Sequence, residues 1–378
     1  MKVAVLGSGL MGSVISWDLA RSTDVDSFVV ADISEERLAA LKSRVGGSKL
    51  STEVVNVKDT ARAAAFMKGF DVVASALPHG TVNPANLAAV EAGAKMVDIA
   101  FEDAQMELDG AMRQKGGLLI PGCGLAPGLG GILLAQGVRE QKGANEGHIL
   151  VGGIPQKPRP PFGYKLVFSI VGLIREYTDD ARVFRGGKIV KVKPFSTVEE
   201  VKLPTVGKLE AFCTDGLASL VYTMKGMRVM DEKTLRWPGH AEKMNLLLET
   251  GFFSTEKLRF EGGEVSPIEV AWKVLERKLG EGEPKDMTVM RVEAKSRRSE
   301  VIYDLVDRYD ATNGITSMGR TTGFTCSIVT QMVGSGRIRG AGVLPPESAV
   351  TGDGVDALVS ELRRRGVRIS KKQRQKKY

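Results

Sequence analysis

Apolar runs alternate with helical patterns over residues 1–124, and this alternation predicts an α/β protein with a doubly wound parallel sheet. The chain opens with the apolar run 2–6, the glycine turn 7–12 (GSGLMG) and then apolar residues at helical spacing. Later runs joined by β-hairpin signals predict a second, α+β domain with a largely antiparallel sheet. The opening strand–GxGxxG–helix unit places the first domain in the Rossmann class, which binds dinucleotides.

The elements of the first domain follow from its apolar runs. Strands are expected at residues 2–6, 28–31, 54–57, 71–77, 95–99 and 117–121, and helices include residues 59–68 and 83–92. Ligands of such sheets bind beyond the carboxyl ends of the strands. The residues that follow each strand are therefore candidates for a ligand site.

The pattern changes after Pro121. The glycine-rich residues 122–131 lead into a helix at about residues 130–141 and are interpreted as the crossing to the second domain. Ser266 and Glu269 form a capping box at the start of a further helix. Other expected elements are strands at 148–153, 182–185, 188–193, 287–294 and 301–310 and a helix at 324–333.

These patterns predict four parts of the chain. They are a dinucleotide-binding domain at residues 1–124, a second domain at 125–317 whose antiparallel sheet offers a dimerisation surface, a segment at 318–362 that returns to the first domain, and a basic tail at 363–378.

The glycine turn and an acidic residue after the second strand predict a dinucleotide site. Gly7 permits a tight bend, Gly9 lets backbone amides approach a pyrophosphate, and Gly12 lets helix and strand pack closely. Asp32 lies twenty residues after Gly12, where a carboxylate accepts hydrogen bonds from ribose hydroxyls and repels a 2′-phosphate. Arg37 offers a counter-charge that weakens this exclusion, and Asp32 could instead only cap the next helix. The pattern favours NAD over NADP.

The other candidate cofactor residues lie in the glycine turn, at the carboxyl ends of the expected strands or directly after them. They are Ser8, Leu10, Met11, Ile33, Val57, Ser75, Ala76, Leu77, Pro78, Asp98 and Ala100. His79 follows Pro78 and is expected to line the same edge, and residues 98–102 are expected near the nicotinamide.

Composition excludes several classes of protein. The 378 residues are 43% hydrophobic and 26% charged, as in an ordinary globular protein, which argues against disorder. No apolar run approaches the ~18 residues of a membrane span. The three cysteines are far apart and odd in number, which excludes a disulfide scaffold. The three histidines are also scattered, so no metal site is expected. Because the first residues read as a strand and not as a signal peptide, a cytoplasmic location is expected.

The net charge of +8 is concentrated at one end. Residues 363–378 hold nine basic side chains and no acidic one, so the rest of the chain is close to neutral. A solvated, frayed terminus is expected, with RNA or a membrane surface as the alternative ligand of this cationic run. No aromatic residues interleave the basic ones, and no specific nucleic-acid or membrane partner is expected.

Several further motifs carry a resemblance to a known family. They are residues 7–12 with Asp32, 161–165 (PFGYK), 174–178 (IREYT), 214–217 (TDGL), 234–244 (TLRWPGHAEKM), 320–324 (RTTGF) and 342–347 (GVLPPE). With them the chain resembles the saccharopine dehydrogenase family, and within it the lysine 6-dehydrogenases, over nearly its full length. The resemblance implies NAD-dependent oxidation of the ε-amine of L-lysine to 2-aminoadipate 6-semialdehyde with release of ammonia. It also implies that residues 1–124 are an NAD-binding domain, that residues 125–317 are a substrate-binding and dimerisation domain, and that the protein is a homo-oligomer of at least two chains.

Hydride transfer from an amine needs a neutral nitrogen, whereas a free lysine ε-ammonium has a pKa of ~10.4. The site must therefore bury the amine or provide a base. His240 is the candidate general acid–base group, since an unperturbed histidine has a pKa of ~6.5; alternatively it is a structural residue at the start of a helix. Tyr164 and Lys165 are the other catalytic candidates, and Tyr164 could close the pocket or donate its hydroxyl.

A lysine substrate also presents an α-carboxylate and an α-ammonium. Arg236, Lys165 and Arg320 are candidate partners of the carboxylate, which an arginine binds bidentately. Asp215 is a candidate partner of the ammonium, or alternatively a helix cap. Asp98 completes the candidate substrate residues.

Three other functions stay open. A saccharopine-type dehydrogenase or reductase would need further basic groups for the carboxylates of a glutamate moiety. A polyamine synthase-like transferase would cycle bound NAD without net turnover. A dinucleotide sensor whose tail binds nucleic acid would lack a substrate-shaped pocket of convergent charges.

Overall fold

The computed structural model describes residues 1–141 and 143–375, which form two compact units. Unit 1 comprises Met1–Glu140, Ala218–Lys225 and Gly319–Ile369, and unit 2 comprises Gln141–Leu217, Gly226–Met318 and the residues from Ser370 onward. Unit 1 extends past the expected boundary at residue 124 because α6 (Leu129–Glu140) belongs to it. It also contains the short segment 218–225, which sequence patterns do not indicate.

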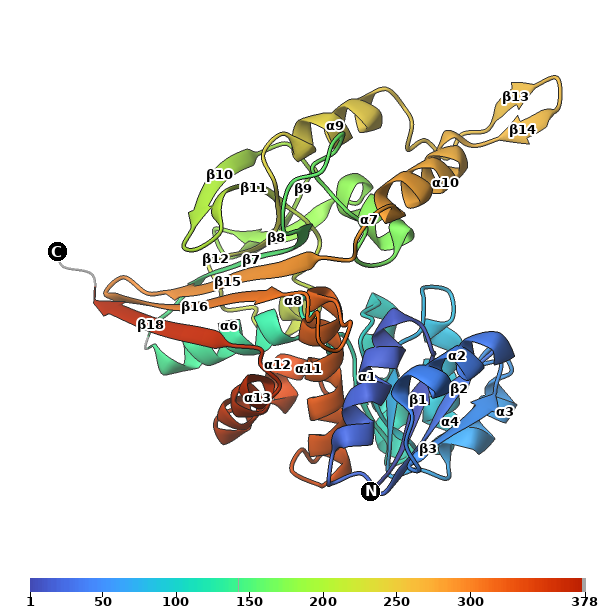
Figure 1. Ribbon diagram of the computed structural model, residues 1–378. Coiled ribbons are helices and arrows are strands. Elements are labelled where there is room, and N and C mark those ends of the chain that lie inside the picture. The colour runs from blue at the N-terminus through green and yellow to red at the C-terminus, as the bar shows by residue number, and fades with distance from the viewer. Residues whose placement is uncertain (142, 376–378) are drawn as a thin grey trace. The chain divides into compact units, whose positions relative to one another are not determined.

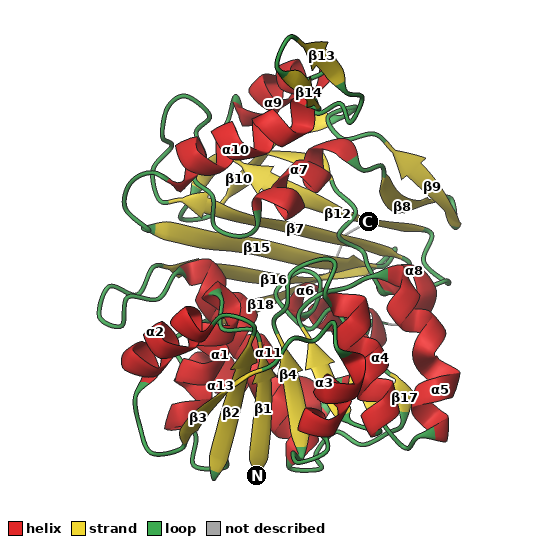
Figure 2. Cartoon of the chain, turned by 90° about the vertical axis from the view of Figure 1, so that its right-hand side faces the viewer, coloured by secondary structure: helices red, strands yellow, loops and turns green. Residues whose placement is uncertain are grey.

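Unit 1 is built on a seven-stranded sheet in which all the paired strands are parallel (Figure 2). The strand order is β17-β6-β5-β4-β1-β2-β3. The strands are β1 (Lys2–Leu6), β2 (Ser27–Asp32), β3 (Leu50–Val54), β4 (Val72–Ser75), β5 (Lys95–Asp98), β6 (Leu118–Ile120) and β17 (Gly342–Val343). Because β1 lies between β2 and β4, the strand order reverses there, and this switch point is where such sheets bind ligands.

Helices cover both faces of this sheet. The helices of unit 1 are α1 (Leu10–Arg21), α2 (Glu35–Val45), α3 (Thr60–Met67), α4 (Val82–Ala92), η1 (Asp103–Leu108), α5 (Asp109–Gln114), α6, α8 (Leu220–Thr223), α11 (Ser317–Gly334), α12 (Pro346–Ala349) and α13 (Asp353–Arg364). Residues of α3, α4 and α5 form one core cluster with the sheet. On the other face, α11 packs on α1 and β4, since a Cβ on Gly323 would lie 2.9 Å from Val14 and one on Gly334 2.9 Å from Val72.

Unit 2 contains a nine-stranded sheet (Figure 1). Its main path is β10-β11-β12-β7-β15-β16-β18, and β8 pairs with both β12 and β9. The strands are β7 (Glu146–Pro155), β8 (Ala181–Arg185), β9 (Lys188–Val192), β10 (Val198–Leu203), β11 (Gly207–Cys213), β12 (Val229–Arg236), β15 (Asp286–Lys295), β16 (Ser299–Arg308) and β18 (Ile369–Gln375). The prediction of a largely antiparallel sheet is confirmed, and β7 with β12 is a parallel pair within it.

Three helices pack on one face of this sheet and bury an apolar cluster that includes Phe212. They are α7 (Ile170–Thr178), α9 (His240–Glu249) and α10 (Pro267–Gly280). The capping box of Ser266 and Glu269 is present at the start of α10. Between α9 and α10 the hairpin of β13 (Leu258–Phe260) and β14 (Gly263–Val265) extends away from both helices (Figure 1). Among the residues described, no helix is long and apolar enough to cross a membrane.

The third strand was expected at residues 54–57, and this prediction is wrong by several residues because β3 ends at Val54. Beyond it the chain turns at residues 57–58, where the Asn56 side chain accepts from the Lys58 N–H at 3.1 Å. As an edge strand, β3 pairs only with β2 and carries polar residues, which hid it from an analysis based on apolar runs.

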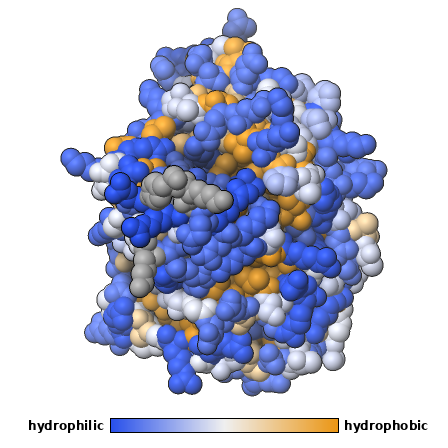
Figure 3. All heavy atoms as spheres, turned by 90° about the vertical axis from the view of Figure 1, so that its left-hand side faces the viewer, coloured by the Kyte–Doolittle hydropathy of each residue, from blue (hydrophilic) through white to orange (hydrophobic). Residues whose placement is uncertain are grey.

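The basic tail was expected to be frayed, and this expectation is wrong for residues 363–375. Arg363 and Arg364 end α13, and β18 pairs with β16 at the edge of the unit 2 sheet. Lys372 Nζ lies 3.6 Å from Asp304 Oδ2. The face of the molecule on this side is mainly hydrophilic (Figure 3). Residues 376–378 of the expected tail lie outside the described residues.

Buried charges hold the end of α13 within unit 1. The Asp18 carboxylate of α1 is 4% exposed and accepts from Arg365 Nε at 2.6 Å and Nη2 at 3.0 Å. The same carboxylate accepts from Ser327 Oγ of α11 at 2.7 Å and from Gln331 Nε2 at 3.3 Å. One carboxylate therefore joins α1, α11 and the residue that follows α13.

We expect Arg365→Met to lower the free energy of unfolding of unit 1 by about 3 kcal/mol, because it leaves the Asp18 carboxylate buried without its counter-charge. Amide hydrogen exchange over α1 and α11, measured by mass spectrometry, checks this. Arg364→Met is the matched control, since that side chain is 71% exposed and its loss should cost less than about 0.5 kcal/mol. Equal protection in Arg365→Met and wild type would contradict the prediction.

Candidate functional site

The glycine turn of unit 1 joins β1 to α1, and its three glycines differ in their surroundings. Gly7 has a φ of +92°, and a Cβ on it would lie 2.6 Å from the Ala76 carbonyl oxygen. A Cβ on Gly12 would lie 1.9 Å from the Gly7 carbonyl oxygen. A Cβ on Gly9 would meet nothing within 4 Å. Gly7 and Gly12 are thus required by the turn itself, whereas Gly9 leaves open space at the N-terminus of α1.

Asp32 lies directly beside this turn, at the carboxyl end of β2. Its Oδ2 accepts from the backbone N–H and the hydroxyl of Ser8, each at 2.8 Å. Its Oδ1 accepts from the Ser34 N–H at 2.9 Å and from Arg37 Nη2 at 2.7 Å. Burial would raise the pKa of Asp32, but these donors outweigh it and lower the pKa below its ordinary value. The residue is therefore an anion near neutral pH.

Most of the other cofactor candidates of unit 1 lie at the same edge of the sheet. Leu10 is 44% and Ile33 61% exposed. Met11, Ala76, Leu77 and Ala100 are partly exposed, Pro78 is exposed, and Ser8 and Ser75 are buried. Val57 instead lies in the core cluster under α3 and α4, so its side chain is turned away from this edge.

Titratable groups gather after β4 and β5 of unit 1. Asp98 is 0% exposed and accepts from the Ala100 N–H at 3.0 Å and from Gln105 Nε2 at 3.2 Å, and burial raises its pKa to about 7. His79 Nδ1 lies 3.3 Å from Glu102 Oε1, with the two side chains 40% and 28% exposed. Sequence analysis placed His79 at this edge but missed its pairing, which depends on the adjacency of β4 and β5.

His240 lies inside unit 2, at the first position of α9. It is 1% exposed, with Nε2 2.8 Å from the Tyr177 hydroxyl and Nδ1 2.9 Å from the Phe162 carbonyl oxygen. Burial, assisted by the charge of Arg236, lowers its pKa to about 3. The imidazole is therefore neutral at ordinary pH and joins α7, α9 and the 155–163 loop.

The two basic residues of unit 2 expected to bind a carboxylate have partners within the protein. Arg236 is 2% exposed and forms an ion pair with Glu176 of α7. Lys165 Nζ donates to the carbonyl oxygens of residues 280, 281 and 282 at 3.1, 3.2 and 3.1 Å, and so caps the C-terminus of α10. These contacts favour structural roles for Arg236 and Lys165.

Two further substrate candidates are also engaged. Asp215 accepts from the Arg182 N–H at 3.0 Å and from its Nε at 3.0 Å. Arg320 belongs to unit 1, where its guanidinium lies 5.8 Å from the Phe324 ring centroid and donates to the Arg365 carbonyl at 3.2 Å. Asp215 is thus a partner of an arginine in unit 2.

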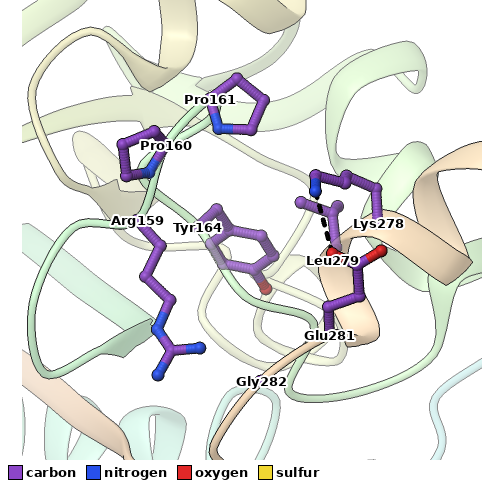
Figure 4. A pocket seen from close by; sticks show the side chains of 8 residues that line it. All are labelled: Arg159, Pro160, Pro161, Tyr164, Lys278, Leu279, Glu281 and Gly282. Atoms are coloured by element: carbon purple, nitrogen blue, oxygen red, sulfur yellow. Dashed lines mark hydrogen bonds and ion pairs between the residues drawn. The ribbon is translucent and has the colours of Figure 1, made fainter.

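Tyr164 is the candidate of unit 2 that borders an open cavity. The cavity has a volume of about 280 Å³ and lies between the proline-rich loop before Tyr164 and the C-terminus of α10 (Figure 4). Arg159 lines it as well. In the sequence, residues 161–165 of this loop stand out only as a family motif, and nothing in a single sequence marks Arg159 as part of a cavity.

Family models match almost all of the chain. Residues 3–120 match the saccharopine dehydrogenase NADP binding domain, and residues 124–367 match the saccharopine dehydrogenase C-terminal domain.

Two curated proteins are similar at low identity. The mitochondrial alpha-aminoadipic semialdehyde synthase of Mus musculus is 24% identical over 287 residues, which cover 72% of this chain and 30% of that protein. The chain thus spans less than a third of the length of this relative. Saccharopine dehydrogenase (NADP(+), L-glutamate-forming) of Schizosaccharomyces pombe is 21% identical over 455 residues, covering 97% of this chain and 98% of the relative.

A solved structure has the same fold. It is apo histidine-tagged saccharopine dehydrogenase (L-Glu forming) from Saccharomyces cerevisiae, with a TM-score of 0.81, 19% identity and coverage of 99% of both chains. The expected resemblance is confirmed at the level of the family and its α/β fold. The chain belongs to the saccharopine dehydrogenase family of oxidoreductases.

Proposed function

We propose that this chain is an NAD-dependent dehydrogenase that oxidises the ε-amine of L-lysine to 2-aminoadipate 6-semialdehyde and releases ammonia. The observation that carries the proposal is the Asp32 carboxylate, held by Ser8 beside the open glycine turn. The choice of lysine rests on the resemblance of segments 161–165 and 234–244 to lysine 6-dehydrogenases.

The glycine turn has the form that a dinucleotide requires. The open space at Gly9 leaves room for a pyrophosphate at the N-terminus of the twelve-residue helix α1, whose first-turn amides and dipole favour an anion. When bound, the nicotinamide supplies the hydride acceptor. The four acceptor positions of Asp32 are all engaged, so a ribose hydroxyl must replace one donor. Arg37 is the donor most easily displaced, because its side chain is 57% exposed.

The reaction also needs a group that receives protons. The carbon–hydrogen bond of the substrate breaks as its hydride leaves, water then adds to the iminium carbon, and the carbon–nitrogen bond breaks to release ammonia. His79 with Glu102 is our candidate for proton transfer, since both are solvent-accessible and follow strands at the ligand-binding edge of unit 1. His240 is a poor candidate because it is buried and neutral.

A saccharopine-type reaction is the second candidate, and the names of the two curated relatives favour it. It would oxidise a secondary amine and release an amino acid in place of ammonia. A polyamine synthase-like transferase would produce no net NADH. We also propose a cytoplasmic location and an assembly of at least two chains.

A panel of substrates tests the proposal. With NAD and L-lysine, we expect NADH and ammonia to accumulate in equal amounts, because each hydride transferred commits one nitrogen to hydrolysis. Absorbance of NADH and an enzymatic ammonia assay measure the two products. Saccharopine turnover without ammonia would favour the second candidate, and product formation without NADH would favour the transferase.

The Asp32 carboxylate should set the cofactor preference. We expect wild type to use NAD with a higher kcat/KM than NADP, and Asp32→Asn to lower kcat/KM for NAD by about 10–100-fold, as the loss of one charge-assisted hydrogen bond implies. Steady-state kinetics with both cofactors measure this. Asp59→Asn, which changes a carboxylate at the N-terminus of α3, is the control. A wild-type preference for NADP would contradict the prediction.

The pH dependence of stability should identify His240 as a buried neutral group. The pKa of His240 is about 3 in the folded protein, against ~6.5 when unfolded. Its contribution to stability is therefore complete above about pH 6.5 and is lost as the pH falls towards 3. His240→Asn should destabilise unit 2 at neutral pH, flatten the loss of stability in acid, and leave the pH profile of kcat/KM unchanged.

His79→Gln is the matched variant. It should lower kcat by about 10²–10⁴-fold, while thermal stability stays close to wild type. A large fall in kcat in His240→Asn but not in His79→Gln, with both variants folded, would reverse these roles.

A further inference from the structure

One cavity of unit 2 has no role in the proposed chemistry so far. It is lined by residues of the loop before α7 and of the C-terminal end of α10, and we call it the Arg159 pocket (Figure 4). Its lining residues are Arg159, Pro160, Pro161, Tyr164, Lys278, Leu279, Glu281 and Gly282. Its volume of about 280 Å³ is near the lower limit for small-molecule sites, which suits a ligand the size of one amino acid.

The floor of the pocket presents a hydroxyl without a partner. Tyr164 is 3% exposed, and its hydroxyl has no hydrogen bond. Figure 4 shows this hydroxyl directed into the space between Arg159 and Glu281. The ring itself is fixed, because it lies 4.7 Å from the Arg236 guanidinium and 5.2 Å from the His240 ring. A buried hydroxyl without a partner is unfavourable, and a ligand oxygen would remove that cost.

The wall of the pocket carries excess positive charge. Over the described chain, no carboxylate lies within ion-pair distance of Arg159. The Lys278 ammonium is neutralised by Glu281 at 2.9 Å, and the Lys165 ammonium contacts only carbonyl oxygens at the end of α10. The guanidinium of Arg159 lies so close to Gly282 that a Cβ there would be 2.0 Å from its Nη1. An anion is therefore the ligand that this wall favours.

We propose that the Arg159 pocket binds the α-carboxylate of the amino-acid substrate, with Arg159 as its ion-pair partner and the Tyr164 hydroxyl as a hydrogen-bond donor, an inference that rests on the proposed function. The planar guanidinium matches a carboxylate in shape and charge. Glu281 lies on the opposite wall, where it can accept a hydrogen bond from the α-ammonium of the same molecule (Figure 4). Arg159 thereby takes the role for which the sequence offered Arg236, Lys165 and Arg320 as candidates.

This assignment can be tested in the full-length protein with NAD and three amines that differ in their α groups. L-lysine carries both α groups, 6-aminohexanoate lacks the α-ammonium, and cadaverine lacks the carboxylate. Arg159→Gln should raise KM for L-lysine and 6-aminohexanoate by about 10–100-fold, as the loss of one hydrogen bond to a charged group implies, with little change in kcat. KM for cadaverine should not change. Tyr164→Phe should raise the same two KM values by a smaller factor.

Lys157→Gln is the matched control, since it removes a positive charge from the same loop outside the pocket. It should leave all three KM values unchanged. An equal rise in KM for cadaverine, or unchanged KM values in Arg159→Gln, would overturn the proposal.

A binding measurement keeps this test separate from the proposed reaction. If wild type does not oxidise L-lysine, the proposed function fails, and calorimetry with L-2-aminoadipate and with glutarate still tests the pocket. Both probes should bind wild type and Lys157→Gln equally and Arg159→Gln about 10–100-fold more weakly. Circular dichroism confirms that each variant is folded. Absence of binding to wild type, or equal affinity for Arg159→Gln, would overturn the carboxylate assignment.

Discussion

The buried ion pair of Arg236 and Glu176 is the constraint on which the interior of unit 2 depends. A charge that is only 2% exposed is tolerated when a counter-charge accompanies it, so β12 and α7 are fixed relative to each other. The Arg236 guanidinium then lies 4.7 Å from the Tyr164 ring, and the His240 ring lies 5.2 Å from the same ring. His240 Nδ1 in turn lies 2.9 Å from the Phe162 carbonyl oxygen, which links the imidazole to the loop before α7. Arg236 and His240 thus hold the ring of Tyr164, which lines the Arg159 pocket.

Much of unit 1 could be predicted because its signals are local. Each buried strand is one apolar run, and the glycine turn requires no knowledge of distant contacts. Asp32 could be placed beside Ser8 because adjacent parallel strands bring their carboxyl ends together. The prediction was wrong at β3, an edge strand with polar residues, and at Val57, whose side chain packs into the core. Both errors come from treating apolar character as a measure of position in the sheet.

The catalytic candidates of unit 2 were less predictable, because burial depends on long-range packing. Histidine, arginine and lysine suit catalysis, but the same side chains stabilise interiors once donors and acceptors surround them. Lys165 contacts a carbonyl oxygen 115 positions further along the chain, which no local pattern reveals. His240 is neutral because α7, α9 and α10 exclude water from it, and the sequence around it shows only a turn followed by a helix.

Positive charge in this protein is informative where it has no partner. Basic residues near the C-terminus are engaged: Arg365 pairs with Asp18 in unit 1, and Lys372 with Asp304 in unit 2. Their number left an anionic ligand open as the alternative to a frayed terminus, whereas Arg365 and Lys372 form ion pairs within the protein. Arg159 differs because its guanidinium borders a cavity, beside a buried hydroxyl that also has no partner. The Tyr164 hydroxyl is a buried polar group without a partner, which reduces stability, and such departures from good packing are expected at binding sites, where a ligand supplies the missing partner. The basic tail and the Arg159 pocket therefore differ in whether their charged groups have partners within the protein, and not in how many positive charges they hold.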